Sequence, residues 1–517
     1  MKLKELIFIL IFSCYCFSQS YSQDDVISKI IEIGKTDNQT MKHLDFLCNR
    51  FGGRTHGSDS YDNAAEWCAY KFKEWGMEVV MDEAGQENIG FNRGPWFGRL
   101  LSDDGMELHF ATPSYTAGTK GVQRALVVIE PKTQAEFDRM KGKLKGAWVL
   151  ITGTNNGWPV NTTYEGKKRR EAAIQKNIEI TKENEKIKEE NKNLPAEKQK
   201  KLIELQDEPA LFYEQMKTAG ILGVIQSSKL PIRVMSDRMK MDSMNFENLP
   251  EICDIKLDEH QYQKIYQMAK ERKYFLLEFD IRNYFKLGPV KYHNVIGIIK
   301  GTKYPDEYVV LSSHLDAYDV ASGGVDDGSG TSAHMEAARL IMAAGGKPDR
   351  TILVCLWAGE EFGLLGSQSW VNRNIDKHSK ISAVFNRDGG PTPPMGLSVS
   401  QAMWEDMEKV CKPVNEINKD FPFTLTKREP SVLPVKPGGS DHSSFEVYGI
   451  PALNFDCPDI KGYDFDYYEI WHTERDMYNL SIPEYQEHTA VVTAVIAYGV
   501  ANLEKLLSRE GYFKKEK

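Results

Sequence analysis

The sequence has no surplus of basic residues and no long apolar run. Its 65 lysine and arginine residues are outnumbered by 74 aspartate and glutamate residues, which gives a formal net charge of −9. Without a basic surplus the chain is poorly suited to neutralise phosphate groups, so nucleic acids and anionic membrane surfaces are not expected as main partners. No apolar stretch approaches the roughly 20 residues that cross a bilayer. We therefore expect no membrane span.

Dense cysteine patterns are also missing. Beyond the first 22 residues the six cysteines are scattered and form no CxxC pair. Neither a disulfide framework nor a cysteine-rich metal site is expected, although an oxidising compartment would allow a Cys48–Cys68 bridge. The chain has no GxSxG motif either, which disfavours a serine hydrolase of the α/β type.

The first 22 residues predict a signal peptide. A basic start and the short apolar run Leu6–Phe12 precede the small-x-small cleavage site Ser20-Tyr21-Ser22. We expect export to the periplasm or secretion without an anchor. A lipoprotein attached at Cys14 is a minor alternative.

The rest of the chain predicts two kinds of domain. Residues 23–94 and 288–517 show strands alternating with helices, which is typical of an α/β domain with a mostly parallel twisted sheet and helices on both faces. Residues 95–287 carry short β-like runs between Gly, Pro and Asn turns, and we interpret them as an inserted β-rich domain. Within it, residues 164–207 are dominated by charged side chains and predict a solvated helical hairpin broken at Pro195.

Side chains that bind metals follow several predicted strands of the α/β domain. These strands are Tyr308–Ser312, Thr351–Trp357 and Ile381–Phe385, and the residues after them or in later loops are His314, Asp316, Asp326, Asp327, Glu360, Glu361, Asp388 and His472. Because the carboxyl ends of parallel strands meet at one sheet edge, these side chains are expected to converge. Two imidazoles with several carboxylates suit two zinc ions that share one carboxylate, about 3.5–4 Å apart.

The residue types also suggest a division of labour. Adjacent glutamates on a tight turn cannot easily bind one metal together, so one can bind while the other transfers a proton. Asp316 follows His314 by two residues, a position that suits orientation of the imidazole. The residues alone leave open whether Asp326 or Asp327 is the shared carboxylate.

The motifs HLDAYD, GGVDDGSG, WAGEEFGLLGS, FNRDGG and HTERD together resemble the M28 family of di-zinc peptidases, in particular its aminopeptidase and carboxypeptidase Q branches. The resemblance implies a zinc exopeptidase fold, in which the insertion at residues 95–287 corresponds to a protease-associated domain. It implies a set of five zinc ligands, with His314 and Asp388 on one ion, Glu361 and His472 on the other, and Asp326 shared. Glu360 would then be the general base that activates water, and Asp316 would orient His314.

The function implied by this resemblance is hydrolysis of terminal peptide bonds in peptides or dipeptides. The sequence does not decide between an aminopeptidase and a glutamate carboxypeptidase or dipeptidase. His442, Asp441 and Arg387 are candidates for the substrate pocket. Two alternatives are a single-zinc acyl transferase resembling glutaminyl cyclase and a metal-free binding protein on the same fold. The oligomeric state stays open, with a homodimer as one option.

Overall fold

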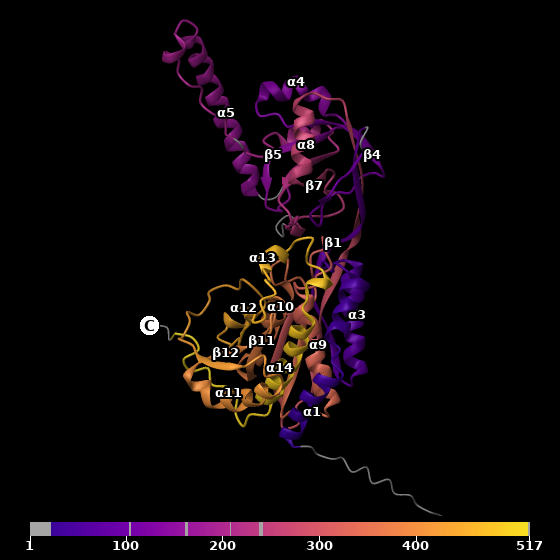
Figure 1. Ribbon diagram of the computed structural model, residues 1–517, viewed down its shortest axis with the longest axis vertical. Helices are drawn as coiled ribbons and strands as arrows, with labels where there is room; N and C mark the ends of the chain where they lie inside the picture. The colour runs from indigo at the N-terminus through magenta and orange to yellow at the C-terminus, as the bar shows by residue number, and fades with distance from the viewer. Residues whose placement is uncertain (1–21, 103–104, 161–163, 207, 237–240, 515–517) are drawn as a thin grey trace, which may run out of the picture.

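The computed structural model describes residues 22–102, 105–160, 164–206, 208–236 and 241–514. Apart from Ser22, the predicted signal peptide and its alternative lipid site Cys14 lie outside these ranges. Figure 1 shows a lower lobe and an upper lobe joined by two long strands, β1 (Glu78–Leu101) and β8 (Leu276–Ile299). Within the ranges described, no helix combines the length and the apolar character that a membrane crossing requires.

The lower lobe is built on five neighbouring strands in the order β11-β9-β10-β8-β1. The strands β9 (Tyr304–His314), β10 (Arg350–Trp357) and β11 (Ile381–Asn386) are mutually parallel. The strand β8 pairs antiparallel with β10, and β1 pairs antiparallel with β8. The strands β10 and β11 are buried along their length, and β9 is buried from Val309 to His314, as expected for strands covered on both faces. Their carboxyl ends therefore share one edge of the sheet.

Helices cover both faces of this sheet, as predicted. Alternate residues of β10 belong to two different cores: Ile352 and Val354 pack on one face, and Leu353 and Cys355 pack on the other. The helices of the first face are α1 (Gln23–Thr36), α3 (Asp59–Glu74), α9 (Gly328–Ala343), α11 (Trp404–Cys411) and α14 (Pro483–Ala501), and those of the second are α10 (Leu365–Arg373) and α12 (His442–Glu446). The side sheet of β12 (Gly396–Val399), β13 (Thr424–Lys427) and β14 (Phe455–Asp456) completes the lobe.

The upper lobe continues the same sheet. It contains β2 (Met106–Glu107), β3 (Phe110–Ala111), β4 (Gln123–Ile129), β5 (Trp148–Asn155), β6 (Gly223–Ser228), β7 (Cys253–Asp258), α4 (Gln134–Leu144), α5 (Tyr164–Asn191), α6 (Tyr213–Thr218) and α8 (Glu259–Lys270). The boundaries expected after residues 94 and 287 fall inside β1 and β8. Three β-bulges interrupt the β1–β8 pairing, two of them beside Gly85 and Gly94. In the sequence these glycines look like turns, but here the strands run on through them.

The charged segment is a helix with an extended return rather than a helical hairpin. The helix α5 projects from the upper lobe (Figure 1), and the chain after Lys200 runs back along it without helical structure. Asn177, Asn184 and Asn191 each exchange two hydrogen bonds with the backbone of the return, at Gln206, Ile203 and Lys200 respectively, over 2.6–3.1 Å. These amides satisfy the backbone groups of the return, so a second helix is not needed.

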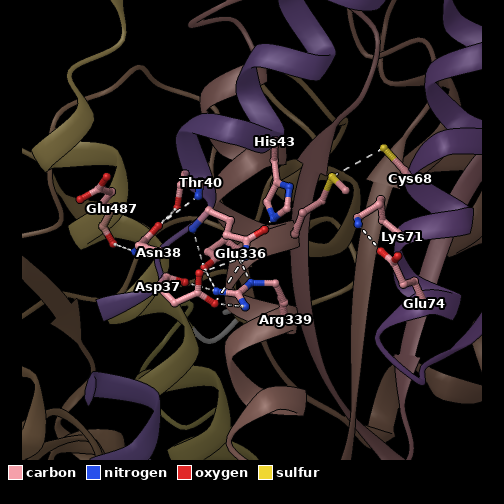
Figure 2. Close-up of polar contacts among 12 residues, drawn as sticks. Asp37, Asn38, Thr40, His43, Cys68, Lys71, Glu74, Glu336, Arg339 and Glu487 are labelled. Carbon is pink, nitrogen blue, oxygen red and sulfur yellow. Dashed lines mark hydrogen bonds and ion pairs between the residues drawn. The ribbon is translucent and has the colours of Figure 1, made fainter. Parts of the chain in front are cut away.

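A buried polar cluster fixes α9 against the amino-terminal helices (Figure 2). The carboxylate of Glu336 on α9 lies 3.1 Å from His43 Nε2 of α2 (Thr40–Asp45) and accepts hydrogen bonds from Arg339 at 2.7 and 2.8 Å. Arg339 also reaches Asp37. Glu336 is fully buried, and these partners offset the cost of burying its charge.

All six cysteines of the described ranges are free thiols, so no Cys48–Cys68 bridge is present. The Cys48 thiol faces the carbonyl oxygen of Gly323 at 3.7 Å, and the Cys68 thiol faces Met335 Sδ at 3.6 Å. Both are buried packing residues.

Candidate metal centre

The carboxyl ends of three parallel strands bring the predicted metal-binding residues together. His314 is the last residue of β9 and pairs in register with Trp357, the last residue of β10. Glu360 and Glu361 follow β10, and Asp388 follows β11. This is the edge at which open α/β sheets form their sites.

The first group consists of His314, Asp326 and Asp388. His314 Nε2 lies 3.2 Å from Asp326 Oδ1 and 3.6 Å from Asp388 Oδ1. The His314 side chain is completely buried, and the two carboxylates are nearly so. One nitrogen and two oxygens therefore point into a common small space.

The second group consists of Asp326, Glu361 and His472. His472 Nε2 lies 2.9 Å from Glu361 Oε2 and 3.6 Å from Asp326 Oδ2. Asp326 thus belongs to both groups: its Oδ1 faces His314 and its Oδ2 faces His472. A carboxylate placed in this way has the geometry of a bridge between two cations.

The buried carboxylates and unpaired ligand atoms of the two groups favour bound cations. His314 Nε2, Asp326 Oδ2 and Glu361 Oε1 are buried and have no hydrogen-bond partner within the described part of the chain. Burial raises the pKa of Asp326 and raises that of Glu361 well above its usual range. Buried carboxylates without partners are expensive, and bound metal ions would supply the missing charge. The nitrogen and oxygen donors are those that zinc accepts.

Asp327 has a different position from its neighbour. Its Oδ1 accepts a hydrogen bond from the N–H of Gly330 at 2.8 Å, which caps α9, and its Oδ2 accepts from the N–H of His314 at 3.2 Å. Both oxygens are used in holding the loop and the helix start. A Cβ at Gly330 would lie only 2.1 Å from the carbonyl oxygen of Arg387, so this close packing needs glycine.

Asp316 orients the site in two ways. The Nδ1 of His314 lies 2.9 Å from the backbone oxygen of Asp316 and 3.7 Å from its carboxylate. The carboxylate accepts hydrogen bonds from the backbone N–H groups of Glu360 and Glu361 at 3.1 and 3.3 Å. The imidazole is therefore fixed by the main chain of Asp316, and the glutamate pair by its side chain.

A cavity of about 510 Å³ opens over the two groups. It is lined by Asp326, Glu360, Glu361, Asp388, Gly439, Ser440, His442, Tyr467, Tyr468, Trp471 and His472. Glu360 thus lies beside the metal-binding residues without belonging to either group. Burial raises the pKa of Glu360 well above its usual range.

The three expected pocket residues lie in different places. His442 lines the cavity. Asp441 is fully buried, and burial raises its pKa to about 7. Arg387 is buried beneath the loop after β11, where its guanidinium contacts the Cys457 thiol at 2.8 Å and the backbone oxygens of that loop. Arg387 is therefore not among the residues that line the cavity.

Asp476 is a site residue that sequence reasoning missed. It stands in the HTERD motif, four residues after His472. Its Oδ1 accepts hydrogen bonds from the N–H groups of Val325 at 2.6 Å and Asp326 at 3.3 Å. It therefore ties the loop that carries Asp326 to the loop that carries His472. The motif alone gave no reason to separate this residue from its charged neighbours.

Comparison with known proteins agrees with this geometry. Residues 294–496 match the model of peptidase family M28. This part of the chain is M28-like. Strands β9, β10 and β11 and every residue of the two groups lie inside the matched range, so the sheet edge that carries them is the part of this M28-like metallopeptidase that matches the family.

Two relatives align with this M28-like chain over different shares of its length. Carboxypeptidase Q of Xenopus laevis is 24% identical over 508 residues, which cover 94% of this chain and 92% of that protein. Carboxypeptidase Q of Rattus norvegicus is 30% identical over 221 residues, 42% of this chain and 43% of that protein.

Two solved structures share the fold. A peptidase M28 precursor from Shewanella amazonensis aligns with a TM-score of 0.58 and 20% identity, covering 94% of this chain and 99% of that one. BSAP, a zinc aminopeptidase from Bacillus subtilis, aligns with a TM-score of 0.52 and 18% identity, covering 92% of this chain and 97% of that one.

Proposed function

We propose that this M28-like peptidase is a di-zinc exopeptidase that hydrolyses terminal peptide bonds of peptides or dipeptides. The observation that carries the proposal is the position of Asp326, whose two oxygens face two separate groups of metal-binding side chains. His314 and Asp388 would hold one ion, and Glu361 and His472 the other. Its similarity to carboxypeptidase Q and to a zinc aminopeptidase supports the same class of reaction and the same metal.

Bound at these residues, zinc would supply a Lewis acid that acidifies water and polarises the scissile carbonyl. The protein's own part centres on Glu360, which lines the cavity beside the ligands. Its carboxylate takes the proton of the attacking water and later gives it to the leaving amine. Asp316 keeps the backbone of Glu360 in place.

The cavity favours recognition of a substrate amine over recognition of a carboxylate. A carboxypeptidase needs an arginine or lysine for the terminal carboxylate, and the residues lining the described cavity include neither. Arg387 is occupied elsewhere, and Lys436 is exposed. We therefore propose an amino-terminal preference, with carboxypeptidase or dipeptidase specificity as the alternative.

A panel of dipeptides and longer peptides tests both points. The purified chain is assayed with added zinc on free, amino-blocked and carboxyl-blocked substrates, before and after removal of metal by a chelator. We expect hydrolysis that depends on zinc, is lost on amino-blocked substrates and is retained on carboxyl-blocked ones. Loss on carboxyl-blocked substrates alone would establish the carboxypeptidase alternative. No hydrolysis of any peptide by the chain with two zinc ions bound would overturn the proposed function and favour a binding protein.

The domain organisation and the export of the chain are also proposals. We propose that residues 23–94 and 288–517 form the catalytic domain and that residues 95–287 form a protease-associated-like insertion. A chain expressed without residues 95–287 tests that division. We expect this chain to be much less stable, because both parts share the paired strands β1 and β8. Amino-terminal sequencing of the mature protein from the host's periplasm or medium tests cleavage after Ser22 and separates it from lipidation at Cys14.

A further inference from the structure

A segment of the upper lobe pairs with the loop that carries His472. Residues 232–235 run antiparallel to residues 471–474. The N–H of Val234 donates to the backbone oxygen of His472 at 3.0 Å, and the N–H of Glu474 donates to the backbone oxygen of Ile232 at 3.0 Å. We call residues 232–235 the strap. Its contact falls on the backbone of a metal-binding residue.

Arg233 provides the side-chain part of this contact. Its Nε donates to the backbone oxygen of Trp471 at 3.2 Å, and its Nη2 donates to the backbone oxygen of Tyr468 at 2.5 Å. The guanidinium also lies 5.2 Å from the centre of the Trp471 ring. Arg233 thus links α13 (Tyr467–Ile470) to the residue just before His472. Figure 1 shows α13 at the top of the lower lobe, next to the upper lobe.

Glu474 closes the other side of the strap. Its Oε1 accepts a hydrogen bond from the N–H of Ile232 at 3.0 Å, and its Oε2 lies 2.5 Å from His109 Nε2 of the upper lobe. The loop residues on both sides of His472 are therefore held by the upper lobe, Trp471 through Arg233 and Glu474 through Ile232 and His109.

His472 needs such support because its own conformation is strained. Its φ is +58°, in the left-handed region that residues other than glycine rarely adopt. This conformation is energetically unfavourable and persists where the surroundings hold it. The left-handed backbone is part of what aims the imidazole at Glu361, which lies 2.9 Å away.

Among the residues that the structure describes, the Nδ1 of His472 has no strong hydrogen-bond acceptor beside it. Metal-binding histidines usually donate their second N–H to a carboxylate or carbonyl oxygen, as His314 does to the backbone oxygen of Asp316. The Nδ1 of His472 instead lies 3.2 Å from Met235 Sδ, at the end of the strap, and sulfur is a weak acceptor. The ring also packs on Tyr318, with centroids 4.2 Å apart. The orientation of His472 therefore depends on its backbone more than that of His314 does.

We infer that the strap, with Arg233 as its main side chain, positions His472 for metal binding, so that the upper lobe is a working part of the metal centre. Arg233 is a positioning residue: it contacts the loop and not the ion. The inference rests on the proposed function only in taking zinc as the metal. It predicts that the two zinc sites respond differently to changes in the upper lobe.

Zinc titration of the metal-free full-length chain tests this inference. We expect Arg233→Ala to weaken one of the two binding steps by about 10- to 100-fold, the usual effect of removing a group that orients a ligand, and to leave the other unchanged. Arg233→Lys should recover part of the affinity, because a single ammonium cannot bind both carbonyl oxygens as the guanidinium fork does. The matched control is Arg475→Ala, in the same loop, where Arg475 pairs with Glu469 at the surface.

A double-mutant cycle separates positioning from general loosening. In a His472→Ala background, Arg233→Ala should cause no further loss of zinc, because the residue that it positions is gone. Thermal unfolding in the presence of chelator checks that Arg233→Ala is folded. Wild-type zinc affinity at both steps in a folded Arg233→Ala chain would overturn the inference, as would an equal additional loss in the His472→Ala background. If the wild-type chain binds two zinc ions but hydrolyses no peptide, the proposed function is overturned and this inference still stands.

Discussion

The carboxylate of Asp316 accepts a hydrogen bond from the backbone N–H of Glu360 over 3.1 Å. Its second oxygen lies 3.3 Å from the N–H of Glu361, and the side chain is fully buried. One carboxylate at the end of β9 therefore fixes the turn after β10, which carries both a proposed zinc ligand and the proposed base.

Replacement of Asp316 by asparagine should loosen this turn. An amide nitrogen would face one of the two backbone N–H groups, so one hydrogen bond is lost and one buried donor is left without a partner. We expect kcat to fall by about 10- to 100-fold, together with zinc affinity. Steady-state kinetics and zinc analysis after dialysis measure the two effects. Ser313→Ala, a buried change beside the same strand end, is the control and should keep both values.

The two adjacent glutamates should fail in different ways. Glu360→Gln removes the proton carrier and keeps the proposed ligands, so both metals stay bound while kcat falls by about 10²- to 10⁴-fold. Glu361→Gln weakens a ligand, so zinc content falls first and excess zinc restores part of the activity. Elemental analysis alongside kcat distinguishes them. Normal turnover in Glu360→Gln would remove Glu360 from the mechanism.

Asp326 and Asp327 should also separate experimentally. Asp326 faces both groups of metal-binding side chains, so Asp326→Ala should lower occupancy at both sites. Asp327 instead holds the start of α9 and the backbone of His314, so Asp327→Asn should keep both metals and lose about 1–3 kcal/mol of unfolding free energy. Zinc analysis and chemical denaturation test the pair. Loss of both metals in Asp327→Asn with Asp326→Ala unaffected would reverse the assignment of the bridge.

His488 should make the protein less stable in acid. Burial on α14 lowers the pKa of His488 from 6.5 to about 4. Above pH 6.5 the ring is neutral in both the folded and the unfolded chain; as the pH falls toward 4, the unfolded chain takes up the proton first. The folded state therefore loses stability across this window, by about 3 kcal/mol at its lower end.

The measurement for His488 is the pH dependence of unfolding free energy. His488→Gln should flatten the curve between pH 6.5 and 4 relative to the wild type. His260→Gln, at an exposed position of α8, is the control and should leave the curve unchanged. A His488→Gln curve parallel to the wild type would show that His488 titrates normally in the folded protein.

Residues at the ends of buried parallel strands could be placed from the sequence. His314, Glu361 and Asp388 follow short apolar runs, and the rule that parallel strands share a carboxyl edge predicts their convergence. The choice between Asp326 and Asp327 could not be made in this way, because it depends on which of two neighbours faces inward. That orientation is set by the cap of α9 and by the backbone of His314.

Features that depend on contacts between the two lobes could not be predicted from the sequence. Met235 lies 237 positions from His472 in the sequence, and nothing in its surroundings marks it as a neighbour of a metal site. The β1–β8 ribbon was hidden for another reason: its glycines stand at bulges, which resemble turns when only the local sequence is considered. The extended return after α5 has the composition of a helix, but its backbone forms hydrogen bonds with asparagine side chains of α5 instead.

The three asparagines of α5 that bind the return are seven residues apart, and their partners on the return are three residues apart. Seven residues of helix advance by about 10.5 Å, and three residues of extended chain advance by about 10 Å. The spacing of Asn177, Asn184 and Asn191 on the helix therefore matches that of Gln206, Ile203 and Lys200 on the return. A longer or shorter version of α5 and its return would keep these paired hydrogen bonds only if the helix changed by seven residues for every three residues of the return. Insertions of any other size would leave backbone groups of the return without partners, so only certain lengths of this segment preserve the pairing.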